Sequence, residues 1–287
     1  MEIHHPHSLE ELFATLDGAD GEAKIVAGGT ALVLMLRQGL IAPSRIASLQ
    51  RIEGLNEIVE RNGYVAIGAT ATLREVAATE LVRANAPALA TACGLVGNIR
   101  IRNAGTLGGN IAEADYASDP PAALVALGAS VEIAGPDGLR VSTVEDLFTG
   151  FYGTTLDSTE VITSILIPIS PEMTRQAYVK YRSRSSEDRP CVGVAVWMRL
   201  EEDSETVGEL RVAVGAAAST PQRFTDTERL AHGTVLEELP IEQIADGYAE
   251  QIEALEDFRG SAWYRKQMTR EFVRRAVDSI VGEGKVA

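Results

Sequence analysis

The amino-acid sequence predicts an α+β fold in two parts that meet near residues 170–175. Up to Pro168 the sequence alternates between short strand candidates, turns that contain glycine, and helix candidates. After Pro171 it changes to long antiparallel strand candidates followed by amphipathic helices. The chain has 287 residues, of which 45% are hydrophobic and 23% charged. This length and composition fit one large or two medium globular domains.

The strands of the first part are expected where short apolar runs are bounded by turn residues. They cover residues 24–27, 45–49, 64–69, 129–134, 139–143 and 161–167. Pro136-Asp137-Gly138 is a turn sequence, and it joins the strands on either side of it into a hairpin.

The helices of the first part are expected where capping residues precede apolar runs. They cover residues 9–16, 31–38, from 73 to about 97 with a break near Pro87, and from 119 to 128. Ser8 with Glu11, and Thr72 with Glu75, have the spacing of capping boxes. Asp119 suits an N-cap because two prolines, which a first helical turn tolerates, follow it.

Two segments of the first part are expected to be irregular. Residues 100–111 contain so many glycines that they predict a loop of special backbone shape. Residues 1–7 predict a solvated arm. The three histidines in that arm lack a carboxylate or cysteine at ligand spacing, so we expect no metal site there.

The second part is expected to be a small sheet followed by helices. Strands are predicted over 176–183, 191–200 and 209–217. Helices are predicted near 241–256 and 264–280, where apolar residues recur every three or four positions.

Charge and cysteine content exclude several classes of protein. The chain carries 41 acidic and 26 basic residues, a formal charge of -15, and a field of that sign repels nucleic acid. Its two cysteines, Cys93 and Cys191, lie far apart, which excludes a disulfide scaffold, a four-cysteine zinc site and an iron–sulfur cluster held by this chain alone. Both are expected to be buried small residues. No apolar run approaches the roughly 18 residues of a membrane span and no signal peptide is evident, so we expect a cytoplasmic protein.

Two glycine pairs are candidates for binding a phosphate group. Gly28-Gly29 follows a predicted strand, and Gly108-Gly109 lies in the irregular segment. Successive backbone amides in such turns can form a nest for an anion, so the two pairs together could hold a pyrophosphate. Tight turns without a ligand are the alternative. The sequence has neither the Gly-x-Gly-x-x-Gly fingerprint nor a P-loop, which argues against a Rossmann domain or a P-loop NTPase.

The residues around these glycines carry a resemblance to a known family. The chain resembles the FAD-binding, or medium, subunit of the molybdenum hydroxylases, the family of aerobic carbon monoxide dehydrogenase and xanthine dehydrogenase. The matching segments span nearly the whole chain and are residues 25–32, 101–110, 118–120, 164–168, 178–181 and 259–265.

The resemblance implies a fold and its boundaries. It implies an FAD-binding domain of the vanillyl-alcohol-oxidase type (PCMH-like) over residues 1–172, with α+β subdomains of about 1–55 and 56–172. A C-terminal domain over 173–287 would contain a three-stranded antiparallel sheet and a helical bundle.

The resemblance also implies which residues hold the cofactor. Two loops would wrap the FAD pyrophosphate and ribityl chain. The first loop comprises Ile25, Val26, Ala27, Gly28, Gly29, Thr30, Ala31 and Leu32. The second loop comprises Thr106, Leu107, Gly108, Gly109 and Asn110. Asp119 binds a cofactor hydroxyl, and Lys180 lies near the flavin ring. Val96 and Ile162 line the cofactor. Without the resemblance, Asp119 would be interpreted as a helix cap and Lys180 as a solvated edge charge.

One segment departs from the family pattern. After the lysine, the family usually has Gly-Asp followed by an aromatic residue beside the flavin. This chain has Glu187-Asp188-Arg189-Pro190, so Arg189 stands where the aromatic residue is usual. The access of an electron acceptor to this face of the flavin depends on that replacement.

The resemblance implies an electron-transfer role. The chain would bind FAD non-covalently and pass electrons from [2Fe-2S] clusters on a small partner subunit to an external acceptor, while a large molybdopterin-binding subunit hydroxylates the substrate. A dimer of such heterotrimers is expected. No residue of this chain is expected to act as a catalytic acid, base or nucleophile, or to bind metal, because the flavin itself supplies the chemistry. The alternatives are a stand-alone FAD-dependent oxidoreductase of the same fold and a non-catalytic nucleotide-binding module.

Overall fold

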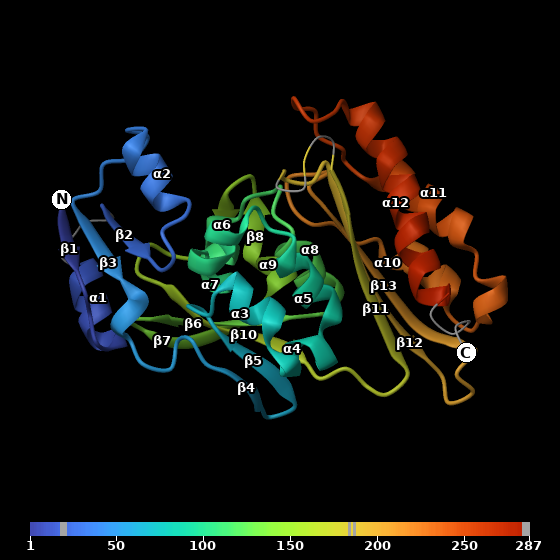
Figure 1. Cartoon of the computed structure of the whole chain (residues 1–287), viewed down its shortest axis with the longest axis horizontal. Coiled ribbons are helices and arrows are strands. Elements are labelled where there is room, and N and C mark those ends of the chain that lie inside the picture. Colours follow the sequence, from blue (N-terminus) through green and yellow to red (C-terminus); the bar gives the residue numbers. More distant parts are fainter. Residues whose placement is uncertain (18–21, 183–184, 186–187, 283–287) are drawn as a thin grey trace.

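The computed structural model describes residues 1–17, 22–182, 185 and 188–282. Three main sheets follow one another along the molecule, and helices lie between and beside them (Figure 1). The α+β class predicted from the sequence is confirmed. Strand β1 lies near one end of the molecule, and helices α11 and α12 lie near the other (Figure 1).

The first sheet is small and parallel. Its strands are β1 (Glu2–His4), β2 (Ala23–Val26) and β3 (Arg45–Ser48), in the order β1-β3-β2. Helix α1 (Leu9–Asp17) buries Leu12 and Leu16 beside the sheet, whereas α2 (Leu32–Arg37) has no buried residue. Residues 2–4 are largely exposed, as expected, but they pair with β3 as an edge strand and do not form a free arm.

The second sheet has five antiparallel strands. These are β4 (Ile58–Arg61), β5 (Tyr64–Gly68), β6 (Ser130–Gly135), β7 (Gly138–Thr143) and β10 (Val161–Pro168), in the order β4-β5-β10-β6-β7. The hairpin of β6 and β7 is confirmed. A short helix α9 (Val144–Leu147) and two short strands, β8 (Phe148–Gly150) and β9 (Gly153–Thr154), follow it.

Six helices lie between β5 and β6 in the described chain and cover one face of this sheet (Figure 1). They are α3 (Leu73–Ala78), α4 (Glu80–Asn85), α5 (Pro87–Gly94), α6 (Ile99–Ala104), α7 (Leu107–Glu113) and α8 (Pro120–Ala126). The predicted capping box of Thr72 and Glu75 starts α3, and the predicted break occurs at Ala86, before Pro87.

The loop expected over residues 100–111 is wrong, because this segment forms α6 and α7. Asn98 caps α6 by accepting hydrogen bonds from the amides of Arg100 and Ile101. Thr106 caps α7 by accepting from the amide of Gly109. Local capping outweighs the low helix propensity of glycine here.

The third sheet is antiparallel, and helices follow it. Its strands are β11 (Thr174–Tyr181), β12 (Val192–Leu200) and β13 (Val207–Gly215), so the three predicted strands are present with bounds shifted by one or two residues, and residue 183 lies outside the described residues. The helices are α10 (Thr225–Glu228), α11 (Ile241–Gln251) and α12 (Ala262–Gly282), and single 3₁₀ turns occur at Leu49–Arg51, Arg229–Ala231 and Leu236–Glu238. The predicted helix over 241–256 ends early because the amide of Leu255 bonds to the carbonyl of Ala217.

The third sheet is buried on both faces. One face contributes Tyr178, Ala195, Trp197 and Ala213 to the core under α5 and α8. The other face contributes Val194, Val196 and Val212, among others, to a second core under α11 and α12. A strand buried on both faces has a continuous apolar sequence, and β12 has one.

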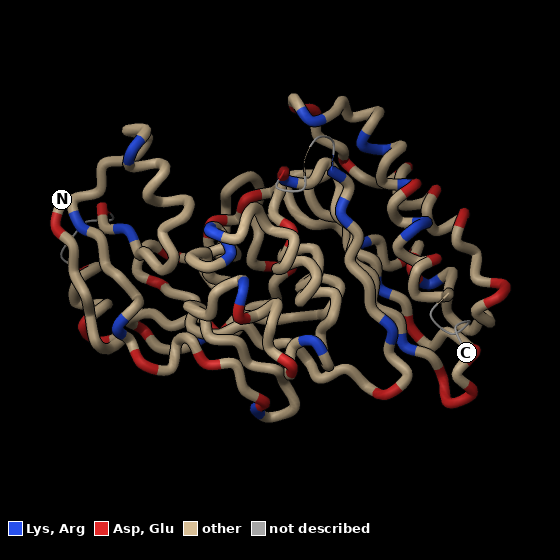
Figure 2. The backbone as a smooth tube through the Cα atoms, in the orientation of Figure 1, with Lys and Arg blue, Asp and Glu red and all other residues tan. Residues whose placement is uncertain are grey.

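Acidic and basic residues are interspersed along the chain (Figure 2). On α12 they form short-range ion pairs, such as Arg275 with Glu271 and Arg274 with Asp278. Within the described ranges, none of the helices is both long and apolar enough to cross a bilayer.

Two glycines at helix positions should respond oppositely to substitution by alanine. A Cβ on Gly108 would lie 2.7 Å from the carbonyl oxygen of Ala69, whereas a Cβ on Gly94 would lie 3.9 Å from the Cβ of Ala77. We expect Gly108→Ala to lower the free energy of unfolding by about 1–3 kcal/mol because α7 must move away from the end of β5. We expect Gly94→Ala to raise it, by up to about 1 kcal/mol. Urea unfolding of both variants measures the difference, and a Gly108→Ala variant as stable as the parent would contradict the packing.

Candidate functional site

The two predicted glycine loops lie against each other. The first loop follows β2, and the second begins where α6 ends. A Cβ on Gly28 would overlap the carbonyl oxygen of Ala104, and a Cβ on Gly105 would lie 3.4 Å from Oγ1 of Thr30. Glycine at these positions is therefore what allows the two backbones to touch.

The first loop offers backbone amides that have no protein partner. Gly29 has a φ of +69°, the left-handed conformation that glycine adopts without strain. Within the described residues, the amides of residues 28–32 bond to no acceptor, although the carbonyls of Gly29 and Ala31 accept from the amides of Val33 and Met35. Consecutive free amides of this kind suit an anion such as a pyrophosphate.

The second loop is built differently. The amides of Leu107 and Gly108 donate to the carbonyls of Ala71 and Ala69, each over 3.0 Å. The amide of Gly109 donates to Oγ1 of Thr106, and that of Asn110 donates to the Thr106 carbonyl. The prediction that both glycine pairs form an anion nest is therefore wrong for Gly108-Gly109, because the amides of this pair hold α7 in place.

Asn110 connects the second loop to a buried ionic cluster. Its side-chain amide and the hydroxyl of Ser118 hydrogen-bond to each other over 2.7 Å. Ser118 precedes Asp119, whose carboxylate accepts from Nζ of Lys180 over 2.8 Å and from the hydroxyl of Tyr178 over 2.7 Å. Nζ of Lys180 also donates to the carbonyl of Leu95 over 2.9 Å.

This cluster lies almost entirely out of solvent. The side chains of Asp119 and Lys180 are 3% and 2% exposed. Burial raises the pKa of Asp119 to about 6, although the Lys180 cation and the Tyr178 hydroxyl favour the ionised form. Burial, together with the charge of Asp119, also raises the pKa of Tyr178 well above its ordinary value.

Two residue-level expectations change with the structure. Asp119 occupies the N-cap position of α8, but its side chain makes no capping hydrogen bond, because both of its oxygens bond to β11. Lys180 does lie on an edge strand, but it is not solvated. Cys93 and Cys191 are both free and buried, as predicted.

The remaining predicted residues lie near the cluster or in the core. Val96 is half-buried beside Leu95 and packs against the main core. Ile162 on β10 is only 3% exposed. Arg189 forms an ion pair with Asp115 over 2.8 Å. Glu187 lies outside the described residues.

Sequence reasoning missed Tyr178 as a partner of Asp119. Tyr178 and Lys180 are two residues apart on one strand, so they share a face of the sheet. That spacing is the signal that could have identified it. The Tyr116 hydroxyl hydrogen-bonds to Asp257 and to Arg259. The sequence gives no comparable signal for these contacts, because they join distant parts of the chain.

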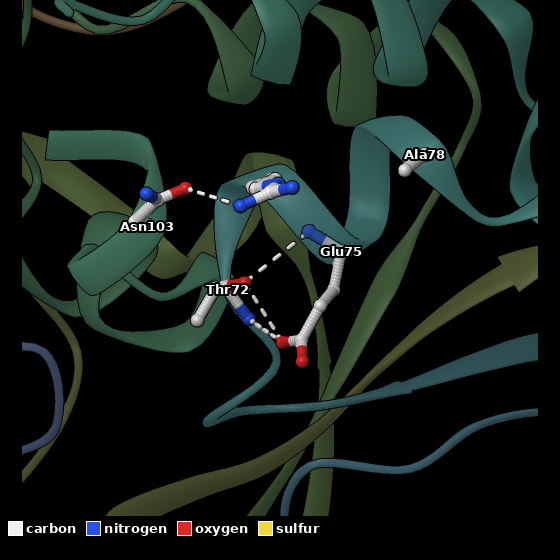
Figure 3. Close-up of a pocket in the computed structure, with 5 residues that line it drawn as sticks. Thr72, Glu75, Ala78 and Asn103 are labelled. Atoms are coloured by element: carbon white, nitrogen blue, oxygen red, sulfur yellow. Dashed lines mark hydrogen bonds between the residues drawn. The ribbon is translucent and has the colours of Figure 1, made fainter. Parts of the chain in front are cut away.

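A surface depression of about 530 Å³ lies between α3 and the end of α6, where Thr72 pairs with Thr106 at the start of the second loop. Thr72, Arg74, Glu75, Ala78 and Asn103 line it (Figure 3). The Glu75 carboxylate bonds to the amide and hydroxyl of Thr72, so this carboxylate serves as the helix cap of α3. Nη1 of Arg74 donates to the side-chain oxygen of Asn103 over 3.4 Å, so part of the polar lining is already paired.

Comparison with known proteins covers the whole chain. Residues 1–170 match the family model described as the FAD binding domain in molybdopterin dehydrogenase, and residues 176–280 match the CO dehydrogenase flavoprotein C-terminal domain. The carbon monoxide dehydrogenase medium chain of Hydrogenophaga pseudoflava is 32% identical over 97% of this chain and 96% of its own length. The nicotine 6-hydroxylase medium subunit of Paenarthrobacter nicotinovorans is 32% identical over 95% of this chain and 94% of its own length.

Solved structures show the same fold. The carbon monoxide dehydrogenase from Hydrogenophaga pseudoflava that lacks the Mo-pyranopterin moiety superposes with a TM-score of 0.93 at 32% identity. The match covers 98% of this chain and 96% of that chain. The predicted fold, with its three-stranded antiparallel sheet and helices in the C-terminal part, is confirmed.

The buried ion pair should make stability depend on pH when its cation is removed. We expect Lys180→Met to lower the free energy of unfolding by about 3–5 kcal/mol near pH 8, because Asp119 is left as an unpaired buried charge. The loss should be smaller near pH 5. Without the cation the pKa of Asp119 rises above its present value of about 6, so the carboxyl is neutral there.

Urea unfolding of the parent and the variant at both pH values measures this effect. In the parent, the folded-state pKa of Asp119 lies above the ordinary 3.8, so its contribution to stability falls as the pH rises from about 4 through about 6. Arg229→Met is the control, since Arg229 and its partner Asp226 are 74% and 90% exposed. It should change stability by less than about 0.5 kcal/mol at either pH. An equal loss at both pH values in Lys180→Met would contradict the role of Asp119.

Proposed function

Because the chain belongs to the family of FAD-binding subunits of molybdopterin dehydrogenases, we propose that it is the electron-transfer flavoprotein subunit of a molybdenum-containing hydroxylase or dehydrogenase. The observation that carries the proposal is the contact between the two glycine loops, together with five consecutive amides on the first that bond to no acceptor among the residues the structure describes. A side chain at Gly28 would overlap the carbonyl oxygen of Ala104 and push the two loops apart. The residues present therefore fit a ligand that carries a pyrophosphate.

The residues proposed to hold FAD divide into three groups. Residues 25–32 would bind the pyrophosphate through their amides. Thr106, Leu107, Gly108, Gly109 and Asn110 would form the opposite wall, with Gly109 exposed on the side that faces Ala27. Asp119 and Lys180, with Val96 and Ile162, would contribute the polar and apolar surroundings of the ribityl chain and the ring.

This chain contributes binding and electrostatics. Bound FAD supplies reversible electron transfer. Asp119 and Lys180 hold each other and the Leu95 carbonyl in a dry environment, so a cation is kept in a defined position at the site.

The cysteine content supports a separate source of electrons. The sequence contains only Cys93 and Cys191, too few for a four-thiolate cluster. The chain would therefore receive electrons from a small subunit with two [2Fe-2S] clusters and deliver them to an external acceptor. A large subunit would carry the molybdenum cofactor. The assembly would be a cytoplasmic dimer of heterotrimers.

The family matches support a division of the chain. We propose an FAD-binding domain over residues 1–172, with subdomains of about 1–55 and 56–172, and a C-terminal domain over 173–287. The ranges of the two family models, 1–170 and 176–280, agree with this boundary.

The purified chain should contain FAD, and Gly109→Val should remove it. A branched side chain at Gly109 would start 2.8 Å from Oγ1 of Thr106 and 4.0 Å from the Cβ of Ala27, which places it between the two loops. We expect a yellow parent whose flavin is released on denaturation, and a colourless Gly109→Val variant whose C-terminal domain still folds. Absorbance at the flavin band gives the ratio of FAD to protein.

Gly94→Val is the matched control for this loss, because Gly94 ends α5 and has only an ordinary contact with Ala77. It should retain the flavin. A parent that cannot be reconstituted with FAD would overturn the proposed function, and stoichiometric FAD in Gly109→Val would exclude the second loop from the site.

Isolation of the native protein should show its partners. We expect it to elute with an iron-bearing and a molybdenum-bearing subunit, at the mass of two copies of each of three chains. Metal analysis and light scattering of the eluted complex measure this. A chain that elutes without such partners and oxidises a substrate alone would favour the stand-alone oxidoreductase.

A further inference from the structure

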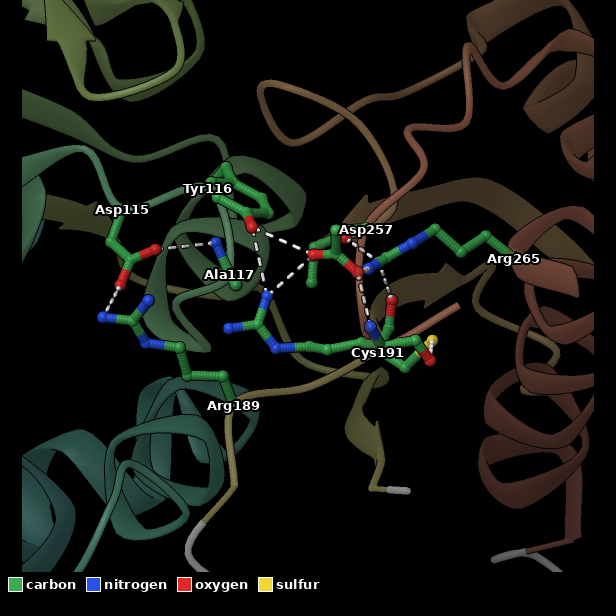
Figure 4. Close-up of polar contacts among 9 residues, drawn as sticks. Asp115, Tyr116, Ala117, Arg189, Cys191, Asp257 and Arg265 are labelled. Carbon is green, nitrogen blue, oxygen red and sulfur yellow. Dashed lines mark hydrogen bonds and ion pairs between the residues drawn. The ribbon is translucent and has the colours of Figure 1, made fainter. Parts of the chain in front are cut away.

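Arginines from the C-terminal part of the chain bind the loop between α7 and α8. Nη1 of Arg259 donates to the hydroxyl of Tyr116 over 3.1 Å and to Oδ2 of Asp257 over 2.9 Å. The Tyr116 hydroxyl donates to the same Asp257 oxygen over 3.0 Å. Arg189 pairs with the neighbouring residue, Asp115, over 2.8 Å (Figure 4). We call Asp115, Tyr116, Arg189, Asp257 and Arg259 the clasp.

The base of the clasp is rigid because it is anchored in the interior. Arg265 is fully buried and donates to Oδ1 of Asp257 and to the carbonyl of Cys191, each over 2.5 Å, and to the carbonyl of Ala216 (Figure 4). The amide of Ala216 in turn donates to the carbonyl of Tyr116 over 3.1 Å. The C-terminal part therefore holds Tyr116 by its backbone as well as by its hydroxyl.

The charge of Asp257 is stabilised within the clasp. Partial burial alone would raise its pKa, but hydrogen bonds from the Arg259 amide, from Arg265 and from Tyr116 hold the pKa below its ordinary value. Asp257 thus stays ionised at neutral pH and can bind both arginines.

The clasped loop leads directly to proposed FAD-binding residues. One oxygen of Asp115 accepts from the amide of Ala117 over 3.1 Å, so the pair with Arg189 also shapes the loop backbone. Ser118 follows and bonds to Asn110 of the second loop. Asp119 comes next and bonds to Lys180. Two side chains of the proposed site thus depend on a loop that the C-terminal part holds.

We propose that the clasp positions Asn110 and Asp119 for FAD, so that Tyr116 and Arg259 set the affinity for the cofactor without touching it. This inference rests on the proposed function, since it concerns the same cofactor. Tyr116, Arg259 and Arg189 are positioning residues in this role. The contribution of Arg189 is smaller, because its side chain is 52% exposed and its ion pair is partly screened by water.

Tyr116→Phe tests the inference with the smallest change, since it removes one hydroxyl from the full-length chain. We expect the dissociation constant of FAD, measured by quenching of flavin fluorescence on titration of the apoprotein, to rise about tenfold. The visible circular dichroism of the bound flavin should change as well, because Asn110 and Asp119 shift around it. Arg259→Met should weaken binding further, and the double variant should bind no more weakly than Arg259→Met alone.

Tyr248→Phe is a matched control from the same chain. The Tyr248 hydroxyl bonds to Glu228 over 3.0 Å, and Arg223 binds the same carboxylate over 2.7 Å, so a second tyrosine–arginine–carboxylate cluster lies away from the loop between α7 and α8. This variant should unfold at a lower urea concentration and yet bind FAD with the parent's dissociation constant and dichroism.

The outcomes are distinguishable. If Tyr116→Phe and the parent bind FAD equally, the positioning role is wrong while the proposed function stands. If Tyr248→Phe weakens FAD binding as much as Tyr116→Phe does, the effect is one of general stability and the inference also fails. If the parent binds no FAD, the proposed function fails and this inference fails with it.

Discussion

The buried ion pair between Asp119 and Lys180 is the interaction on which the arrangement of the two parts of the chain depends. Two charges removed from water must meet each other, since neither is tolerable alone. Asp119 immediately precedes α8 and Lys180 is the penultimate residue of β11, so their contact fixes this helix against this strand. A slip of β11 by one residue would turn Lys180 into the apolar core under α12, so the pair also specifies the register of the sheet.

The glycine contacts impose a second constraint of a different kind. Gly28 and Gly108 allow backbone to lie directly on backbone, at Ala104 and Ala69. Within the described residues the amides of residues 28–32 bond to no acceptor, whereas those of residues 107–110 are all bonded and hold the second loop in place against the first. A rigid second loop and unsatisfied donors on the first loop would make the proposed FAD site more selective than two flexible turns would. The clasp adds support from the C-terminal part at the loop that joins α7 to α8.

Much of the fold could be predicted from the sequence because apolar periodicity and capping residues are local signals. The hairpin of β6 and β7, the capping box of α3 and the three strands of the last sheet were predicted in this way. Residues 100–111 were predicted wrongly, because glycine was interpreted as conformational freedom where its use is close packing. The ion pair between Asp119 and Lys180 could not be predicted, because it is set by the packing of a helix on a strand some sixty residues later in the chain. The edge strand β1 was missed because Glu2–His4 is mostly exposed and lacks an apolar pattern.

The burial of the third sheet on both faces has a consequence for how the chain is made. Helices α5 and α8 are synthesised before β12 and β13, yet Ala195, Trp197 and Ala213 complete the core beneath them. A nascent chain that has emerged from the ribosome only as far as β10 therefore carries a bare apolar face. An exposed apolar face of this kind favours aggregation until the last sheet has been synthesised. The first two-thirds of this protein can reach its final packing only when the remaining third has been made.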